Sequence, residues 1–123
     1  MKAYPLIAVV DDDASVRKAL SRLLTAYGLG VTTFACGQDF IDSIARRRPD
    51  CLILDMDMPG MTGADVQRAL TGCGARVPTI IIAGRDDPDT EARCLAAGAA
   101  AYLRKPIDER VLLDAVTTAL PSA

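Results

Sequence analysis

The chain has 123 residues, half of them hydrophobic, and a formal net charge of −2. This length suits one domain, and the apolar content predicts a folded core instead of a disordered chain. The sequence has neither the basic surplus of a nucleic-acid-binding domain nor the long apolar run of a membrane span, so we expect no direct binding to nucleic acid and no membrane insertion.

Predicted strands and helices alternate along the chain. Short apolar runs predict five strands, at residues 6–10, 31–35, 51–54, 77–83 and 100–103. Apolar residues at helical spacing, together with capping residues, predict five helices, at residues 16–27, 38–47, 64–71, 88–97 and 109–119. This succession predicts an α/β fold, a doubly wound parallel sheet with helices on both faces.

Charged residues follow several of the predicted strands. In parallel sheets the ligand site lies beyond the carboxyl ends of the strands, where the winding reverses. The residues expected at that edge are Asp11, Asp12, Asp13, Asp55, Asp57, Ala83, Gly84, Arg104, Lys105 and Pro106. Each of them alone has an ordinary structural interpretation, since aspartates after strands often cap the next helix and Lys-Pro pairs are common in turns.

The combination of acids with a base predicts more than capping. Carboxylates packed together raise one another's pKa, and a bound cation relieves that repulsion. Oxygen ligands at a small site favour Mg²⁺ or the similar Mn²⁺, with a phosphate as the natural partner. Lys105 can pair with a phosphoryl oxygen, so a neighbouring carboxylate could attack phosphorus and become an aspartyl phosphate.

The absence of histidine and the spacing of the cysteines exclude several other kinds of site. The sequence has no histidine, which removes histidine bases and histidine metal ligands. The four cysteines lie far apart and form no CxxC pair, so they predict scattered thiols and not a metal site or a disulfide framework.

Three motifs, taken in order, resemble those of bacterial response-regulator receiver domains in two-component systems. They are "VVDDD" at residues 9–13, "LILDMDMPGMTG" at residues 52–63 and "YLRKP" at residues 102–106. The resemblance covers about residues 5–120, so we expect a single receiver domain over 1–123. It implies a flavodoxin-like sheet of five strands in the order 2-1-3-4-5, which suits the alternation described above.

The resemblance also implies a role for each site residue. Asp55 is similar in position to the phosphoacceptor of the family. Asp12 and Asp55 correspond to direct metal ligands, and Asp11 corresponds to a ligand that acts through water. The main-chain carbonyl of Asp57 would complete the protein ligands, and Lys105 corresponds to the phosphate-binding lysine.

One position departs from the family pattern. The family has Ser or Thr at the end of the fourth strand, where this chain has Ala83, and the aromatic switch residue corresponds to Tyr102. The hydrogen bond that alanine cannot donate to a phosphoryl oxygen is worth about 1.5–3 kcal/mol, so we expect a weakened switch. Thr79 lies too far back in the strand to replace it, and Arg85 is a candidate partner for the phosphate or Asp57. Family members also have a cis peptide bond before the residue equivalent to Pro106.

The resemblance implies partners as well. The phosphoryl donor would be a phosphohistidine of a sensor histidine kinase, and the receiver would act on a C-terminal output domain or a downstream protein. Helix-turn-helix outputs and transcription regulation are the expected context. Receivers of this kind often form homodimers through the fourth helix, fifth strand and fifth helix. We expect a cytoplasmic acceptor that loses its phosphoryl group slowly and is not a multiple-turnover enzyme.

Three alternatives remain open from the sequence alone. A receiver-like interaction module that works without phosphorylation is favoured by Ala83. A phosphatase of the haloacid dehalogenase type is suggested by the strand followed by Asp55 and Asp57, although that class usually has its first motif near the N-terminus. A flavodoxin-like flavin carrier would need a phosphate loop after the first strand, where three aspartates would repel the phosphate.

Overall fold

The computed structural model describes residues 5–84 and 87–120 and forms one parallel five-stranded sheet. The strands are β1 (Leu6–Val10), β2 (Gly30–Phe34), β3 (Cys51–Asp55), β4 (Thr79–Ala83) and β5 (Ala101–Arg104). The helices are α1 (Ala14–Ala26), α2 (Gly37–Ser43), α3 (Gly63–Gly72), α4 (Pro88–Ala96) and α5 (Glu109–Ala119). The sheet order is β2-β1-β3-β4-β5, which confirms the predicted flavodoxin-like arrangement.

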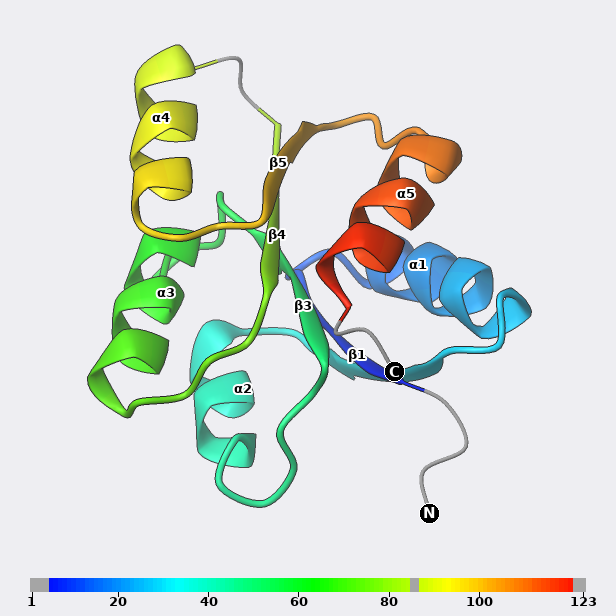
Figure 1. The fold of residues 1–123 in the computed structure, drawn as a ribbon, viewed down its shortest axis with the longest axis horizontal. Coiled ribbons are helices and arrows are strands. Elements are labelled where there is room, and N and C mark those ends of the chain that lie inside the picture. Colours follow the sequence, from blue (N-terminus) through cyan, green and yellow to red (C-terminus); the bar gives the residue numbers. More distant parts are fainter. Residues whose placement is uncertain (1–4, 85–86, 121–123) are drawn as a thin grey trace.

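The helices form a layer on each face of the sheet. Figure 1 shows α1 and α5 together on one face and α2, α3 and α4 on the other. Strand residues that point to opposite faces join two separate hydrophobic clusters, as the two-residue repeat of a strand requires. In β1, for example, Ile7 and Val9 pack with α1 and α5, whereas Ala8 and Val10 pack with α2 and α3. Burial on both faces explains why the inner strands are apolar at nearly every position.

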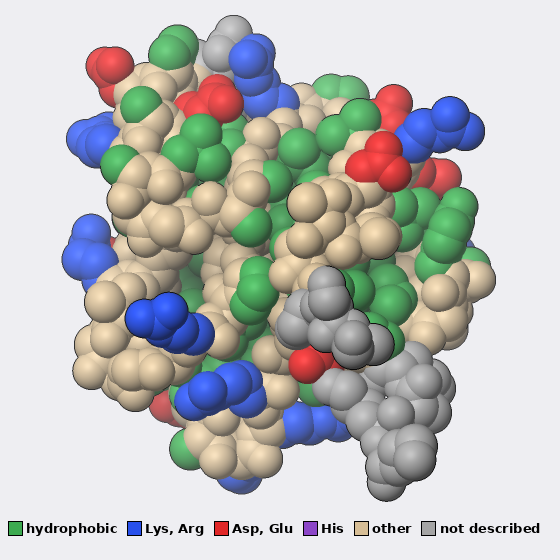
Figure 2. Space-filling model, in the orientation of Figure 1, with side chains coloured by type: hydrophobic (Ala, Val, Ile, Leu, Met, Phe, Trp, Pro, Cys, Tyr) green, Lys and Arg blue, Asp and Glu red, His purple; other side chains and the backbone are tan. Residues whose placement is uncertain are grey.

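β5 forms one edge of the sheet. Hydrophobic side chains lie along the middle of the face drawn in Figure 2, where this edge is exposed between the two helical layers. Among the described residues, no helix is both long enough and apolar enough to cross a bilayer.

Element boundaries differ from the predicted ones at a few places. The second helix ends at Ser43, where the prediction extends it to residue 47. The Ser43 hydroxyl donates to the Phe40 carbonyl, and the residues after Ser43 form turns ahead of Pro49, which does not fit inside a helix. β4 begins at Thr79 instead of residue 77, because Pro78 has no N–H to give to a neighbouring strand.

Candidate functional site

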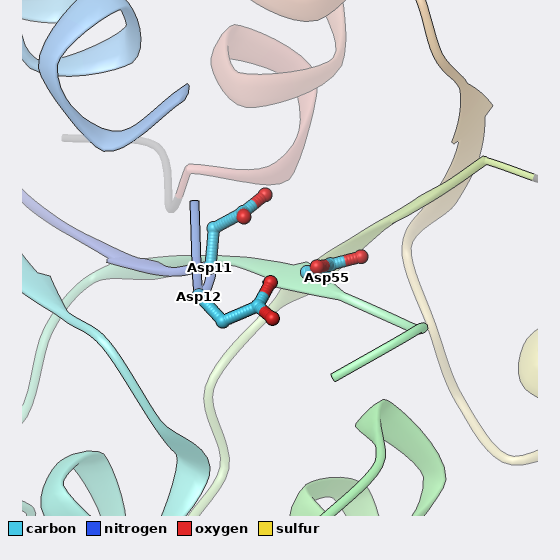
Figure 3. Close-up of side chains that lie close together, drawn as sticks. All are labelled: Asp11, Asp12 and Asp55. Atoms are coloured by element: carbon cyan, nitrogen blue, oxygen red, sulfur yellow. The ribbon is translucent and has the colours of Figure 1, made fainter. Parts of the chain in front are cut away.

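Three carboxylates meet at the carboxyl edge of the sheet. β1 and β3 are neighbours, with Val10 opposite Leu54, so the residues that follow them lie side by side. Oxygen atoms of Asp11, Asp12 and Asp55 all lie within 4.8 Å of one another. Figure 3 shows the three side chains close together, Asp11 and Asp12 from the segment after β1 and Asp55 from the end of β3.

Local hydrogen bonds fix this geometry. The Asp13 N–H donates to Asp11 Oδ1 at 2.9 Å, and the Asp57 N–H donates to Asp55 Oδ1 at 3.1 Å. Asp13 itself accepts from the Ser15 N–H at 2.8 Å and caps α1, so the capping interpretation is correct for this one acid. Two of the acids are therefore held by main-chain donors from residues two positions further along the chain.

An arginine that the sequence reasoning did not select also supports the first acid. Arg17 in α1 donates from its guanidinium to the main-chain carbonyl of Asp11 at 2.7 Å. Arg17 lies four residues after the N-cap Asp13, which places it on the first turn of the helix, beside the cluster. That spacing is the only sequence signal that could have identified it.

Lys105 lies across from the acids. Its Nζ is 3.3 Å from Asp11 Oδ2 and 3.6 Å from Asp55 Oδ1. The main-chain N–H of Lys105 donates to the Ala83 carbonyl at 2.8 Å, and the Lys105–Pro106 peptide bond is cis. The lysine thus reaches two of the three acids from the far side of β4.

Burial and charge act together on the protonation of this cluster. Burial raises the pKa of Asp55, the Asp57 N–H bond acts in the opposite direction, and the Asp11 charge raises it further. Burial alone would lower the pKa of Lys105, but attraction to Asp11 and Asp55 outweighs it, so the net pKa of the lysine is raised. The ammonium therefore stays charged at neutral pH.

The donor set fits a hard divalent cation. Asp11 Oδ2 is buried and has no hydrogen-bond partner among the described residues; its contact with the Lys105 ammonium is an ion pair without hydrogen-bond geometry. Three carboxylates face one ammonium, which leaves excess negative charge at the site. Carboxylate oxygens of this kind are the ligands that Mg²⁺ prefers.

The predicted switch positions lie at the end of β4 and within β5. Ala83 is buried at the end of β4 and offers no hydroxyl. Thr79 gives its hydroxyl to the Val77 carbonyl at 2.9 Å, at the opposite end of the strand from the site. Tyr102 in β5 is half-buried and packs against the hydrophobic cluster on the α2–α4 face. The role considered for Arg85 falls outside the described residues.

Comparison with known proteins agrees with the fold and the motifs. Residues 7–117 match the model of the response regulator receiver domain family. The response regulator protein TmoT of Ectopseudomonas mendocina is 41% identical over 118 residues, which is 96% of this chain and 54% of that protein. The chain therefore spans about half the length of such curated relatives.

Solved structures give the same result. A response regulator receiver protein from Burkholderia phymatum is 44% identical, with a TM-score of 0.84 and coverage of 97% of both chains. The response regulator StyR is 42% identical, with a TM-score of 0.86 over 96% of this chain and 60% of that one. The fold is a doubly wound parallel sheet, and an acidic cluster lies at its carboxyl edge, as the family comparison leads one to expect. This chain belongs to the response regulator receiver domain family of two-component systems.

Proposed function

We propose that this domain accepts a phosphoryl group on Asp55 from a phosphohistidine of a sensor histidine kinase. An Asp55 carboxylate oxygen attacks phosphorus, the new O–P bond forms as the N–P bond to the histidine ring breaks, and the electron pair returns to the ring nitrogen. The product is an aspartyl phosphate, which makes the domain an acceptor with slow hydrolysis and not a multiple-turnover enzyme.

One observation carries this proposal: the Lys105 ammonium lies within 3.6 Å of both the nucleophile Asp55 and its neighbour Asp11. An ammonium in this place can pair with an oxygen of the incoming phosphoryl group and offset its charge. Because phosphoryl transfer depends mainly on placement and charge neutralisation, few other groups are needed from the protein.

The same proposal includes a metal site. Asp12 and Asp55 would bind Mg²⁺ or Mn²⁺ directly, Asp11 would bind through water, and the main-chain carbonyl of Asp57 would complete the protein ligands. When bound, the metal neutralises negative charge on the carboxylates and on the phosphoryl oxygens. The cluster of three acids supports this assignment, as does Asp11 Oδ2, which is buried and has no hydrogen-bond partner among the described residues.

Acetyl phosphate tests the acceptor role directly. Incubation with acetyl phosphate and Mg²⁺ should add one phosphoryl group to the wild-type protein, measured by intact mass, and alkali should remove it. Asp55→Asn should abolish the label, because the amide nitrogen is no nucleophile for phosphorus. Omission of Mg²⁺ should lower the rate at least tenfold, the effect of about 1.4 kcal/mol of lost charge stabilisation. An unlabelled wild-type protein, or a label that survives in Asp55→Asn, would refute the assignment.

A second candidate function is that of an interaction module that works without phosphorylation. It is favoured by Ala83, which leaves the end of β4 without a hydroxyl. The domain would then bind its partner in the same way whether or not Asp55 is phosphorylated. Nuclear magnetic resonance with the phosphoryl analogue beryllofluoride separates the two functions. We expect smaller shifts at Tyr102 and α4 in the wild-type protein than in Ala83→Thr, since the threonine hydroxyl restores a donor worth about 1.5–3 kcal/mol. Equal shifts in the two proteins would contradict the weak-switch proposal.

Partners follow from the same family membership. Relatives include the transcriptional regulatory protein TdiR of Thauera aromatica, so we propose that a C-terminal output domain or a downstream protein controls transcription. A homodimer through α4, β5 and α5 is supported by exposed Leu95 in α4 and Val111 in α5 on either side of the edge strand. The proposal places the domain in the cytoplasm with its kinase, with no direct contact to nucleic acid.

A further inference from the structure

A side-chain contact next to Ala83 has no place in the proposed chemistry. Asp57 Oδ2 accepts a hydrogen bond from the main-chain N–H of Gly84 at 3.0 Å. Gly84 follows Ala83 directly, and Asp57 lies 27 residues earlier, in the loop after β3. The bond therefore ties the loop beside the nucleophile to the segment that leads from β4 toward α4.

Asp57 contacts the nucleophile as well. Its main-chain N–H donates to Asp55 Oδ1 at 3.1 Å, while its carboxylate holds the Gly84 N–H. β3 and β4 are paired, with Asp55 opposite Ile82, so Gly84 lies at the same sheet edge as the acceptor carboxylate. One residue thus connects the site of phosphorylation to the position where the family hydroxyl is missing.

We propose that the Asp57 carboxylate is a positioning residue that holds the Gly84 N–H in the unphosphorylated domain and releases it when Asp55 is phosphorylated. This inference rests on the proposed phosphorylation of Asp55. It gives the domain a conformational response that needs no hydroxyl at position 83: the Gly84 N–H exchanges one anionic acceptor, Asp57 Oδ2, for another, a phosphoryl oxygen.

Charge provides the driving force for the exchange. Phosphorylation replaces the single negative charge of the Asp55 carboxylate with about two on the phosphoryl group, so about one negative charge is added close to the Asp57 carboxylate, and like charges at short range repel. The phosphoryl oxygens are strong acceptors for a main-chain N–H, so the donor is not left unpaired when Asp57 moves away.

Gly84 precedes the N-cap of α4 in the chain, and β4 is paired with β5, which carries Tyr102. Asp87 caps α4 by accepting from the Asp89 N–H at 3.1 Å and the Thr90 N–H at 3.3 Å, so this cap lies three residues beyond Gly84. Burial raises the pKa of Tyr102, and the negative charge of Asp57 adds to the effect, so the phenol senses the charge of Asp57. Release of Gly84 would therefore change the surroundings of both α4 and Tyr102.

The first experiment measures the contact in the unphosphorylated protein. Water exchange of the Gly84 amide, followed by nuclear magnetic resonance, should be about fivefold faster in Asp57→Ala, which lacks the acceptor. Asp57→Asn should give a smaller increase, because its amide oxygen can still accept. The matched control Asp89→Asn removes an exposed charge near the same segment and should leave the exchange rate unchanged. Unchanged exchange in Asp57→Ala would overturn the proposal.

The second experiment measures release, with beryllofluoride and Mg²⁺ as the probe. If Asp57 competes for the Gly84 N–H, the apparent affinity should rise about threefold in Asp57→Asn, which loses only the charge, and about tenfold in Asp57→Ala, which also frees the donor. Asp89→Asn should bind like the wild-type protein. Equal affinities in the two Asp57 variants would contradict competition for the N–H, because charge removal would then explain the whole effect.

The two proposals fail in different ways. A wild-type protein that neither binds beryllofluoride nor takes up phosphate from acetyl phosphate would refute the acceptor function, and the release step would fall with it. The Gly84 exchange rates would still decide whether Asp57 holds the amide. Normal phosphorylation with unchanged Gly84 exchange in Asp57→Ala would refute only the inference about Asp57.

Discussion

The Asp55 carboxylate occupies a position that penalises its own charge. The residue is only 2% exposed, and it lies beside Asp11 at the end of β3. Burial is the largest cause of its raised pKa, and the nearby Lys105 ammonium only partly offsets it. A buried acid of this kind at the carboxyl edge of the sheet is characteristic of a functional site, where reactivity is kept at a cost in folding stability.

This penalty predicts that Asp55→Asn stabilises the domain at neutral pH. Because the pKa of Asp55 is raised in the folded state, ionisation costs folding free energy above that pKa, and the cost disappears below the unfolded value of about 3.9. We expect Tm to rise by about 4 °C at pH 7, the effect of about 1 kcal/mol in a chain of this length. Lys105 keeps its ion pair with Asp11 in the variant.

Thermal unfolding from pH 7 down to pH 3 checks the sign of this effect. The stabilisation by Asp55→Asn should shrink as the pH falls through the raised pKa, because the wild-type carboxyl then takes up its proton. Asp114→Asn, a change of an exposed acid on α5, should show no comparable gain. A variant that is less stable than the wild-type protein at pH 7 would show that the ion pair with Lys105 outweighs burial.

At the scale of elements, α3 depends on close contact with β3, the strand that ends in Asp55. A Cβ added at Gly63, the first residue of α3, would lie 3.0 Å from Met56 Cα and 3.2 Å from the Asp55 carbonyl oxygen. Both neighbours are main-chain atoms, so neither can rotate away. The absence of a side chain at Gly63 therefore allows α3 to begin directly beside β3.

Gly63→Ala should consequently destabilise the domain by about 1–3 kcal/mol, the usual cost of overpacking. Gly72→Ala is the matched control at the other end of the same helix, where an added Cβ meets no atom within 4 Å. That change should stabilise the domain by about 0.5–1 kcal/mol, because alanine is the better helix former. Urea unfolding of the two variants measures both effects, and equal destabilisation would mean that the contact with β3 is not the cause.

The strands and helices were largely predictable because each obeys a local rule. The strand Cys51–Asp55, which is apolar up to Leu54, is buried on both faces. The caps Asp13, Thr62, Asp87 and Asp108 all accept from main-chain N–H groups of the helices that they precede. The end of α2 was not predictable in this way, because the pattern up to residue 47 is compatible with helix, whereas the helix ends at Ser43 and turns follow before Pro49.

At the scale of the whole molecule, the sheet order assembles the site from distant segments. β1 and β3 are adjacent, so the acids after each of them meet, and Lys105 reaches them from the segment after β5. The rule that parallel strands end at one edge was sufficient to predict this grouping. It could not predict the bond from Asp57 to Gly84 or that from Arg17 to Asp11, since both depend on how particular loops and side chains turn.

The excess negative charge at this edge predicts that Mg²⁺ stabilises the whole fold. A ligand that binds only the folded state adds RT ln(1 + [L]/Kd), which is about 1.4 kcal/mol at a concentration ten times Kd. For a chain of this length, we expect Tm to rise by about 5 °C. The unfolded chain cannot share the effect, because residues 11, 12 and 55 come together only through the pairing of β1 with β3.

Asp12→Asn tests whether the stabilisation comes from the cluster. Asp12 is exposed, so its replacement should change the fold little while removing one of the three carboxylates and lowering the Mg²⁺-dependent rise in Tm by more than half. Asp114→Asn, measured with Mg²⁺ in the same way, is the matched control variant. NaCl of equal ionic strength, in place of the magnesium salt, gives the effect of screening alone. Equal rises in the two variants would assign the effect to general screening of surface charge and not to a metal site at the three carboxylates.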